Sequence, residues 1–122
     1  MTWYGRRQTM KLPNCILASV PERKITHYLL NPAHPAGASK AAFFLRFGFK
    51  ATRWRHLAAM LRRHACENQV TEEEITRYGT RYVMDGALRA PDGNDLNIRC
   101  VWFIDDGTEV PRFVTAHPLP KS

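Results

Sequence analysis

The chain has 122 residues, which corresponds to a single domain, residues 1–122, able to bury one modest core. Its 44% hydrophobic and 11% aromatic residues exclude a disordered chain, because such chains lack the apolar surface that offsets the entropy of ordering. The formal net charge of +7 favours binding of a polyanion such as nucleic acid or anionic lipid, although the same charge could serve solubility alone. The sequence contains no run of about 18 apolar residues that would predict a membrane span.

The three cysteines, Cys15, Cys66 and Cys100, lie far apart and form no C-x-x-C pair. This spacing predicts neither a disulfide framework nor a zinc site. We therefore expect a reducing compartment and chemistry without a metal or cofactor. Residues 1–13 lack the apolar segment of a signal peptide, so we expect a cytoplasmic protein, unless it is delivered as part of a larger one.

The first half of the chain predicts helices. Residues 1–12 are mixed and basic and could form a loose N-terminal arm. Residues 14–20 are apolar and predict either a short strand or an extended segment. A helix is expected over residues 21–30, because a proline suits its first position. Three of its residues recur at helical spacing: Ile25, Tyr28 and Leu29.

A Pro- and Gly-rich loop over residues 31–38 carries His34, and a second helix over residues 39–47 ends at Gly48. The third predicted helix, residues 52–65, has the clearest apolar stripe of the chain. The stripe consists of Trp54, Leu57, Ala58, Leu61 and Ala65. The basic remainder consists of Arg53, Arg55, His56, Arg62, Arg63 and His64.

The second half of the chain predicts strands. Residues 67–74 are acidic and follow no clear period. Alternation then predicts strands over residues 80–84, with a possible start at Ile75, and over residues 96–104 and 112–117, separated by turns. The fold class is therefore α+β, with about three N-terminal helices packed on a small antiparallel sheet of about four strands.

Two residues near the second helix are candidates for chemistry on phosphate. His34 could take a proton from a ribose 2′-hydroxyl or return one to a leaving 5′-oxygen, each worth about 10²–10⁴-fold in rate. Lys40 stands at a helix N-terminus, which already favours an anion. The alternatives are an ordinary surface histidine and a lysine that packs over Phe44.

The last strand offers a hydroxyl beside a second imidazole. Alternation places Phe113, Thr115 and His117 on one face and Arg112, Val114 and Ala116 on the other. Thr115 could donate to a phosphate oxygen while His34 and His117 divide the roles of general base and general acid. The alternative is an ordinary edge strand.

Several arginines are candidates for binding a polyanionic substrate. Arg46 lies roughly opposite Lys40 on the second helix, so both cannot face one phosphate from a straight helix. Arg55 and Arg62 on the third helix could follow a phosphate backbone and make binding salt-dependent. The alternative for this helix is a solvated face.

A set of motifs runs along nearly the whole chain, over about residues 12–118. They are Leu29-x-x-x-x-His34-Pro35-x-Gly37-x-x-Lys40-x-x-Phe43-Phe44-x-x-x-Gly48-Phe49, Gly79-x-x-Tyr82, Gly86-x-Leu88-x-x-Pro91-x-Gly93, Val101-Trp102 and Pro111-Arg112-Phe113-Val114-Thr115-Ala116-x-Pro118. Together they resemble a family of small bacterial domains found in toxin-like gene neighbourhoods and at the ends of larger secreted or phage proteins. That family lacks an established activity.

The order of elements is also similar, more loosely, to the barnase, EndoU, colicin and RelE group of metal-independent RNase toxins. This resemblance implies catalysis by side chains alone and implicates His34, Lys40 and Thr115, with Arg112 as a further cation. The family tail usually has tyrosine where this chain has His117, which leaves the role of that residue open. The likeness is one of fold, which by itself does not fix function.

The leading hypothesis is an RNase toxin that cleaves tRNA or mRNA through the 2′-hydroxyl and is held in check by an acidic inhibitor protein. The second is a non-catalytic nucleic-acid- or protein-binding module, such as an antitoxin or regulatory partner. A third, an enzyme that modifies a nucleotide or uses NAD, stays open because no motif excludes it. No membrane partner is expected, and the oligomeric state does not follow from the sequence.

Overall fold

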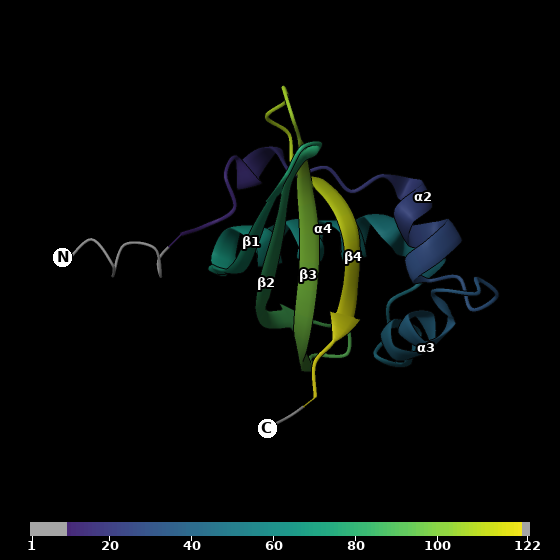
Figure 1. The fold of residues 1–122 in the computed structure, drawn as a ribbon. Coiled ribbons are helices and arrows are strands. Elements are labelled where there is room, and N and C mark those ends of the chain that lie inside the picture. Colours follow the sequence, from purple (N-terminus) through teal and green to yellow (C-terminus); the bar gives the residue numbers. More distant parts are fainter. Residues whose placement is uncertain (1–9, 121–122) are drawn as a thin grey trace.

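Helices fill the first half of the described chain and strands the second half (Figure 1). The structure, a computed structural model, describes residues 10–120. The helical elements are η1 (Cys15–Leu17), α2 (Glu22–Lys24), η2 (Ile25–Leu29), α3 (Ala38–Arg46), η3 (Ala51–Arg53) and α4 (Trp54–Glu67). The strands are β1 (Val70–Thr76), β2 (Gly79–Arg89), β3 (Asp95–Asp105) and β4 (Arg112–Pro118). The predicted α+β fold is confirmed, whereas most of the predicted N-terminal arm, residues 1–9, lies outside the described residues.

The four strands form one antiparallel sheet in the order β1-β2-β3-β4. Helix α4 covers one face, here called the inner face, while α2 and α3 lie beside β4 at the edge of the sheet (Figure 1). The inner face is buried and apolar, with Tyr82, Met84, Ile98, Cys100 and Trp102 at its centre. The opposite face, called the open face, carries Arg81, Asp85, Arg99, Thr115 and His117, which alternate with these rows. No helix among residues 10–120 is long and apolar enough to cross a membrane.

A β-bulge in β4 sets which side chains reach the open face. Val101 pairs with Thr115, whereas the next residue of β3, Trp102, pairs with Phe113, so β4 contains one extra residue there. The bulge shifts the alternation, and Phe113 is buried together with Ala116. The prediction that Phe113 shares a face with Thr115 and His117 is therefore wrong, and so is the placement of Arg112 on the opposite face, because Arg112 pairs with Phe103 in a row of the open face. Thr115 and His117 do share a face.

One segment differs from its sequence-based prediction, and another folds where the sequence led to no prediction. Residues 14–20 form no ladder strand; they contain the short helix η1, and only Ser19 makes an isolated bridge, with Arg112. The acidic residues 67–74, which carried no prediction, contain the end of α4 and most of β1. Strand β1 is exposed at residues 71–75, and because an edge strand with both faces in solvent needs no apolar alternation, its sequence shows none.

Helix α4 buries a wider face than the sequence suggested. Leu57, Leu61 and their apolar neighbours are buried as predicted, but His64, expected on the basic side, is 1% exposed. Its Nε2 lies 3.2 Å from the Gly86 carbonyl and 3.0 Å from the Ile98 carbonyl. Burial lowers the pKa of His64, although the two carbonyls oppose the effect. This histidine is therefore part of the packing between α4 and the sheet.

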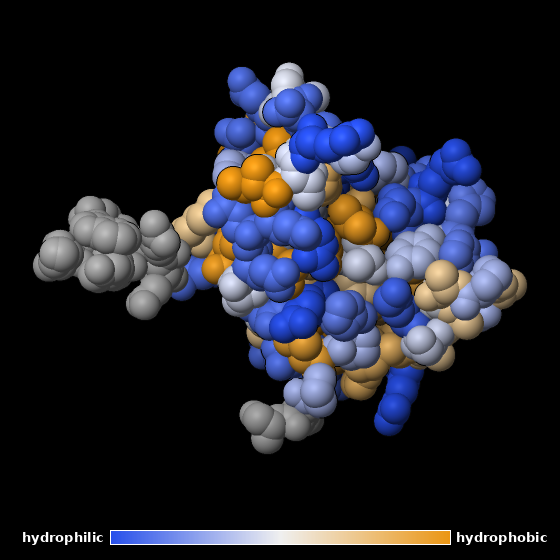
Figure 2. Space-filling view, in the orientation of Figure 1, coloured by the Kyte–Doolittle hydropathy of each residue, from blue (hydrophilic) through white to orange (hydrophobic). Residues whose placement is uncertain are grey.

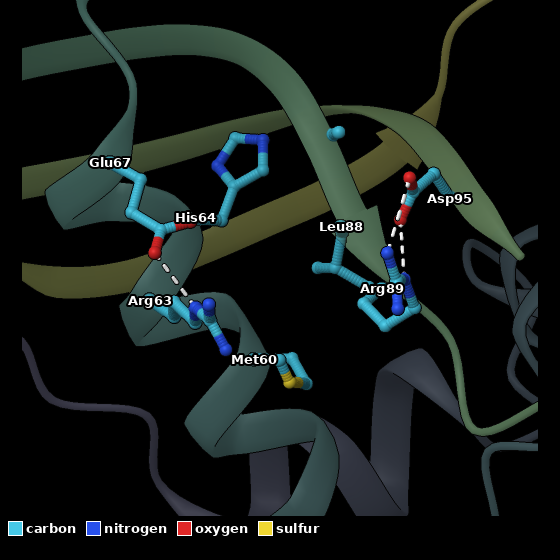
Figure 3. A pocket seen from close by; sticks show the side chains of 8 residues that line it. Met60, Arg63, His64, Glu67, Leu88, Arg89 and Asp95 are labelled. Atoms are coloured by element: carbon cyan, nitrogen blue, oxygen red, sulfur yellow. Dashed lines mark hydrogen bonds and ion pairs between the residues drawn. The ribbon is translucent and has the colours of Figure 1, made fainter. Parts of the chain in front are cut away.

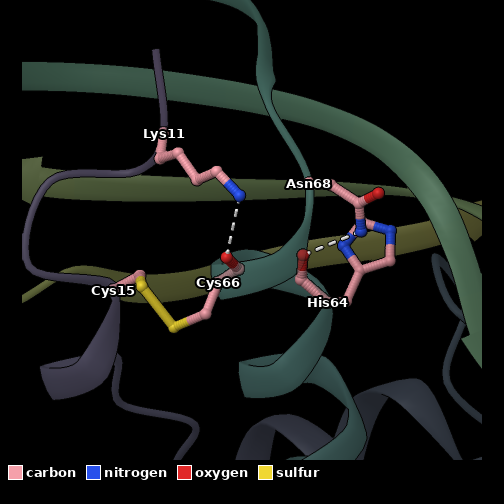
Figure 4. The surroundings of a disulfide bond; sticks show 5 residues. All are labelled: Lys11, Cys15, His64, Cys66 and Asn68. Atoms are coloured by element: carbon pink, nitrogen blue, oxygen red, sulfur yellow. Dashed lines mark hydrogen bonds between the residues drawn. A yellow bond between two sulfur atoms is a disulfide. The ribbon is translucent and has the colours of Figure 1, made fainter. Parts of the chain in front are cut away.

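A disulfide joins Cys15 in η1 to Cys66 near the end of α4 (Figure 4). The two Cα atoms are 5.3 Å apart although 51 residues separate them in sequence, so the prediction of no disulfide is wrong. Sequence spacing could not reveal this contact, because it arises only when η1 packs on α4. Cys100 is a buried free thiol. Since disulfides mark proteins that pass through oxidising compartments, the expectation of a reducing compartment loses its basis.

Removing this disulfide should destabilise the fold. Replacing both cysteines, Cys15→Ser with Cys66→Ser, is expected to lower the free energy of unfolding by about 2–4 kcal/mol, because the unfolded chain gains the freedom of a long loop. Urea unfolding, followed by the fluorescence of buried Trp102, measures the change. Reductant should lower the stability of the wild type and leave the double variant unaffected. Equal midpoints for oxidised and reduced wild type would contradict the assignment.

Candidate active site

The hydroxyl of Tyr28 is the meeting point of three elements. Tyr28 lies in η2, and its Oη is 2.8 Å from Oγ1 of Thr115 on β4. The Nζ of Lys40, in the first turn of α3, donates a hydrogen bond to the same Oη over 2.8 Å. The chain segments before and after the Pro- and Gly-rich loop are thereby joined to the edge strand of the sheet, and all three side chains are partly buried.

The loop between η2 and α3 can make this turn because Gly37 lies directly against Tyr28. A Cβ atom at Gly37 would come within 2.7 Å of the Tyr28 carbonyl oxygen, which no side chain could accept without a shift of the backbone. The loop is further held by its own polar groups, since the Ala33 N–H donates to Oδ1 of Asn31 over 3.0 Å. A short, internally bonded loop therefore fixes the start of α3 and with it Lys40.

His34 lies on the inner side of this loop, with its ring edge-on to Tyr28 and a centroid separation of 5.2 Å. The Ala36 N–H donates to its Nδ1 over 3.0 Å. Because Nδ1 accepts this hydrogen bond, the proton of the neutral ring is on Nε2. His34 thus carries a hydrogen-bond donor at Nε2 on a ring that packs against the ring of Tyr28.

His117 lies in one row of the open face with an ion pair. Asp85, Arg99 and His117 are cross-strand neighbours on β2, β3 and β4. Arg99 donates two hydrogen bonds to the Asp85 carboxylate, over 2.8 and 2.9 Å, and these hydrogen bonds hold the pKa of Asp85 below its usual range. The Asp85 carboxylate is therefore ionised at neutral pH.

Burial lowers the pKa of His117, and the positive charges of Lys40 and Arg99 lower it further. The carboxylate of Asp85 opposes them but does not reverse the shift. His117 is consequently a neutral imidazole at pH 7, the form that can accept a proton. The influence of Lys40 on His117 also indicates that α3 and the end of β4 share one electrostatic environment.

Tyr28 is polarised by its surroundings. Burial works to raise the pKa of Tyr28, but hydrogen bonds with Lys40 and Thr115 and the charges of Lys40 and Lys24 outweigh it, so that the pKa is lowered. Lys40 has donors only, so Tyr28 Oη accepts from it. When the Tyr28 O–H in turn donates to Thr115, the Thr115 hydroxyl proton is free to bond an anionic ligand.

The structure brings together four of the residues proposed for catalysis. Lys40 and Thr115 both bond Tyr28, His34 packs on its ring, and His117 lies on the face of β4 that Thr115 shares. Tyr28 and these four residues, together with Asp85 and Arg99, are called the Tyr28 cluster below. The contacts of Tyr28 and the strand pairings of Asp85, Arg99 and His117 are observations; a role in catalysis stays a prediction.

The arginines proposed for substrate binding lie elsewhere. Arg112 bonds Asp105 over 2.7 and 3.2 Å and covers the ring of Phe103, so its charge is already paired. Arg46 stacks on the neighbouring Phe47. Arg55 and Arg62 are on α4, which packs on the inner face and therefore turns its polar side away from the Tyr28 cluster.

Sequence reasoning missed Tyr28, Asp85 and Arg99. Tyr28 was predicted only as one of three residues at helical spacing, a pattern that indicates packing. Arg99 occupies an outward position of the strand predicted over residues 96–104, and Asp85 directly follows the strand predicted over residues 80–84. Alternation could therefore have placed both side chains on one face of the sheet. Their pairing needed the register of β2 with β3, which the sequence does not state.

Figure 2 shows the open face, with hydrophilic residues over most of the sheet. No group of three or more His, Cys, Asp or Glu side chains within residues 10–120 is arranged to hold a metal ion. The Tyr28 cluster instead presents donors from an ammonium, a hydroxyl and an imidazole, whereas the Arg99 guanidinium is paired with Asp85. Such a set suits an anionic oxygen ligand.

A separate cavity of about 230 Å³ lies between α4 and the end of β2 (Figure 3). Its rim carries two ion pairs, Arg63 with Glu67 at 2.7 Å and Arg89 with Asp95 at 2.6 Å. Because each cation there is paired with a carboxylate, the cavity offers little net attraction for a polyanion. It is a weaker candidate than the Tyr28 cluster.

The electrostatic link between Lys40 and His117 can be tested by titration. The pKa of His117, followed by NMR of its ring, should rise in Lys40→Met, because a positive charge that disfavours the imidazolium is removed. It should fall in Asp85→Asn, which removes the carboxylate and leaves Arg99 unpaired. Lys24→Met is the matched control and should leave His117 unchanged. An unchanged titration of His117 in Lys40→Met would contradict the assignment.

Comparison with known proteins places this fold. No curated protein matches the sequence. The chain is similar to one chain of a solved structure, the contact-dependent growth inhibition toxin–immunity protein complex from Klebsiella pneumoniae 342, with a TM-score of 0.68 over 88% of this chain and 97% of that chain. The two sequences are 16% identical, so this likeness concerns the fold alone. The model of the family described as Domain of unknown function (DUF6883) matches residues 11–120, and the chain belongs to this family.

Proposed function

We propose that this chain is a metal-independent endoribonuclease toxin that cleaves tRNA or mRNA through the ribose 2′-hydroxyl. The observation that carries the proposal is the Tyr28 cluster, in which Lys40 and Thr115 both bond the Tyr28 hydroxyl, His34 packs on the Tyr28 ring and His117 shares a strand face with Thr115. Cleavage of RNA by side chains alone needs a base, an acid and donors for the phosphate, and the cluster contains all of these.

In the proposed reaction His117 is the general base, because its lowered pKa leaves it neutral at pH 7. It accepts the 2′-hydroxyl proton as the 2′-oxygen bonds to phosphorus and the bond from phosphorus to the 5′-oxygen breaks. His34 acts as general acid in its imidazolium form, after Nδ1 has taken up a proton and released the Ala36 N–H, and it then donates the Nε2 proton to the leaving 5′-oxygen. Lys40 and the Thr115 hydroxyl stabilise the charge on the pentavalent phosphate. The products are a 2′,3′-cyclic phosphate and a free 5′-hydroxyl.

The charge of the chain supports the toxin over the inhibitor of such a pair. The similar structure is a complex that contains both a toxin and an immunity protein, so fold likeness does not separate the two roles. A net charge of +7 and donors on an open face suit a protein that binds RNA. The partner would then be an acidic inhibitor protein, since complementary charge gives fast association.

The disulfide fits a toxin that reaches its RNA from outside. Cys15 and Cys66 would be oxidised during passage through the cell envelope, as part of a larger delivered protein. The site of action would then be the cytoplasm of the target cell, where tRNA and mRNA are found.

Cleavage of RNA with EDTA present is the direct test. Purified wild type at micromolar concentration should cleave total tRNA or mRNA to fragments with cyclic phosphate ends, and should leave DNA intact, because DNA lacks the 2′-hydroxyl. His34→Ala, Lys40→Ala, Thr115→Val and His117→Ala should each lower the rate about 10²-fold or more. The control is Arg77→Lys, a change at an exposed arginine in the turn between β1 and β2. Intact RNA would refute the proposal, and cleavage unaffected by all four substitutions would refute the site.

The second candidate is a non-catalytic binding module, favoured by the position of Arg55 and Arg62 on a basic side of α4 that is separate from the Tyr28 cluster. If the chain is such a module, changing Arg55, Arg62 and Arg63 to alanine together should make the affinity for RNA less dependent on salt concentration. The slope should fall by the equivalent of up to three phosphate contacts. Fluorescence anisotropy at several salt concentrations measures the slope. An unchanged slope would count against the binding module.

A further inference from the structure

A small cavity lies between α3, the start of β3 and the residue that follows β4. Its volume is about 120 Å³. The residues that decide its chemistry are Phe43, Phe47, Asn94, Asp95, Asn97 and Leu119. The proposed function assigns no role to any of them.

Two elements lead from the Tyr28 cluster to this cavity. Phe47 caps α3 seven residues after Lys40, so both lie on the same side of the helix, roughly 10 Å apart along its axis. Asn97 precedes Arg99 by two residues on β3 and therefore faces the same way, roughly 7 Å further along the strand. The Leu119 N–H donates to the Asn97 carbonyl over 2.9 Å, which holds the segment after β4 in place. The cavity thus continues the candidate site along α3.

The lining of the cavity suits a flat, uncharged ring. Phe43 and Phe47 are partly buried and pack on each other with centroids 5.0 Å apart. No lysine, arginine or histidine lines the cavity, and its one charged group, Asp95, is paired with Arg89 at 2.6 Å. The cavity therefore offers a phosphate no unpaired cation among its lining residues, whereas an aromatic ring could pack on Phe43 and on the side of Phe47 that Arg46 does not cover.

Two side-chain amides add hydrogen-bonding capacity at the wall. The Asn97 side chain is exposed and forms no hydrogen bond to another residue in the described range 10–120. Asn94 uses its Nδ2 to donate to Asp92 over 2.9 Å, so its Oδ1 keeps free acceptor capacity. An amide offers both a donor and an acceptor, which matches the edge of a nucleobase.

We infer that this cavity binds the nucleobase next to the cleaved phosphate, with the ring against Phe43 and Phe47 and its edge at Asn94 and Asn97. The inference rests on the proposed function, since the phosphate bound at Lys40 directs the attached base into the cavity. Base stacking and an amide edge would give the enzyme a preference among the four bases at this position.

Binding of the four nucleoside 5′-monophosphates, followed by NMR of the wild-type protein, tests this. At least one of them should shift the side-chain amide signals of Asn97 together with the ring signals of Phe47. Phe47→Leu should weaken its binding about 5- to 150-fold. Leu45→Ala, an exposed position of α3 outside the cavity, is the matched control and should bind like wild type. No shift at Asn97 with any nucleotide, or unchanged affinity of Phe47→Leu, would overturn the inference.

A second variant keeps the test decisive if Phe47→Leu does not fold. Asn97→Asp replaces a donor by an acceptor of the same shape at an exposed position, so it should change the order of affinity among the four nucleotides. Gln69→Glu adds the same charge at an exposed position outside the cavity and should leave that order unchanged. The same order in Asn97→Asp as in wild type would contradict base recognition by this amide.

Failure of the inference can be told apart from failure of the proposed function. RNA cleavage by wild type, without any nucleotide-induced shift at Asn97, would refute the base site and leave the ribonuclease intact. Nucleotide binding in the cavity without RNA cleavage would refute the ribonuclease and leave a nucleotide-binding site.

Discussion

The hydrogen bonds at the Tyr28 hydroxyl are the constraint on which the candidate site depends. Lys40 and Thr115 are 75 positions apart in the chain, yet both lie 2.8 Å from this oxygen. The ammonium therefore stays directed at the open face and cannot extend into solvent, where a lysine side chain has about 2 kcal/mol of rotamer entropy. Without this hydroxyl, α3 and β4 would still pack together, but the ammonium and the threonine hydroxyl would lose their common partner.

The two faces of the sheet divide structural and chemical tasks. Helix α4 covers the inner face and buries His64 at 1% exposure, so the most strongly buried histidine of the chain serves packing. The open face keeps Arg99, His117 and Thr115 accessible. The bulge in β4 makes this division possible, because it lets Phe113 join the core while Thr115 and His117, a few residues later, reach the other face.

Periodic patterns predicted the fold well, since the helices over residues 21–30, 39–47 and 52–65 and the last two strands all have counterparts in the structure. Patterns also led to the candidates His34, Lys40, Thr115 and His117, whose roles stay predictions. The motifs suggested a family without established activity, and the chain belongs to the family described as Domain of unknown function (DUF6883). What failed depends on contacts between distant segments. The disulfide, the β4 bulge and the burial of His64 arise from packing that no local spacing encodes, and Tyr28 looks like any other residue on a packed helix.

The positive charges around His117 give the candidate site a further property. In the free protein, burial lowers the pKa of His117 most, Lys40 and Arg99 lower it further, and Asp85 only partly compensates. An RNA phosphate placed among these cations would bring a negative charge within a few ångströms, which favours the imidazolium. The free protein would then hold His117 ready to accept a proton, and the bound phosphate would make proton uptake more favourable at the moment when the 2′-hydroxyl must lose one. In the proposed reaction, the arrangement would therefore link binding of the anion to activation of the base through charge.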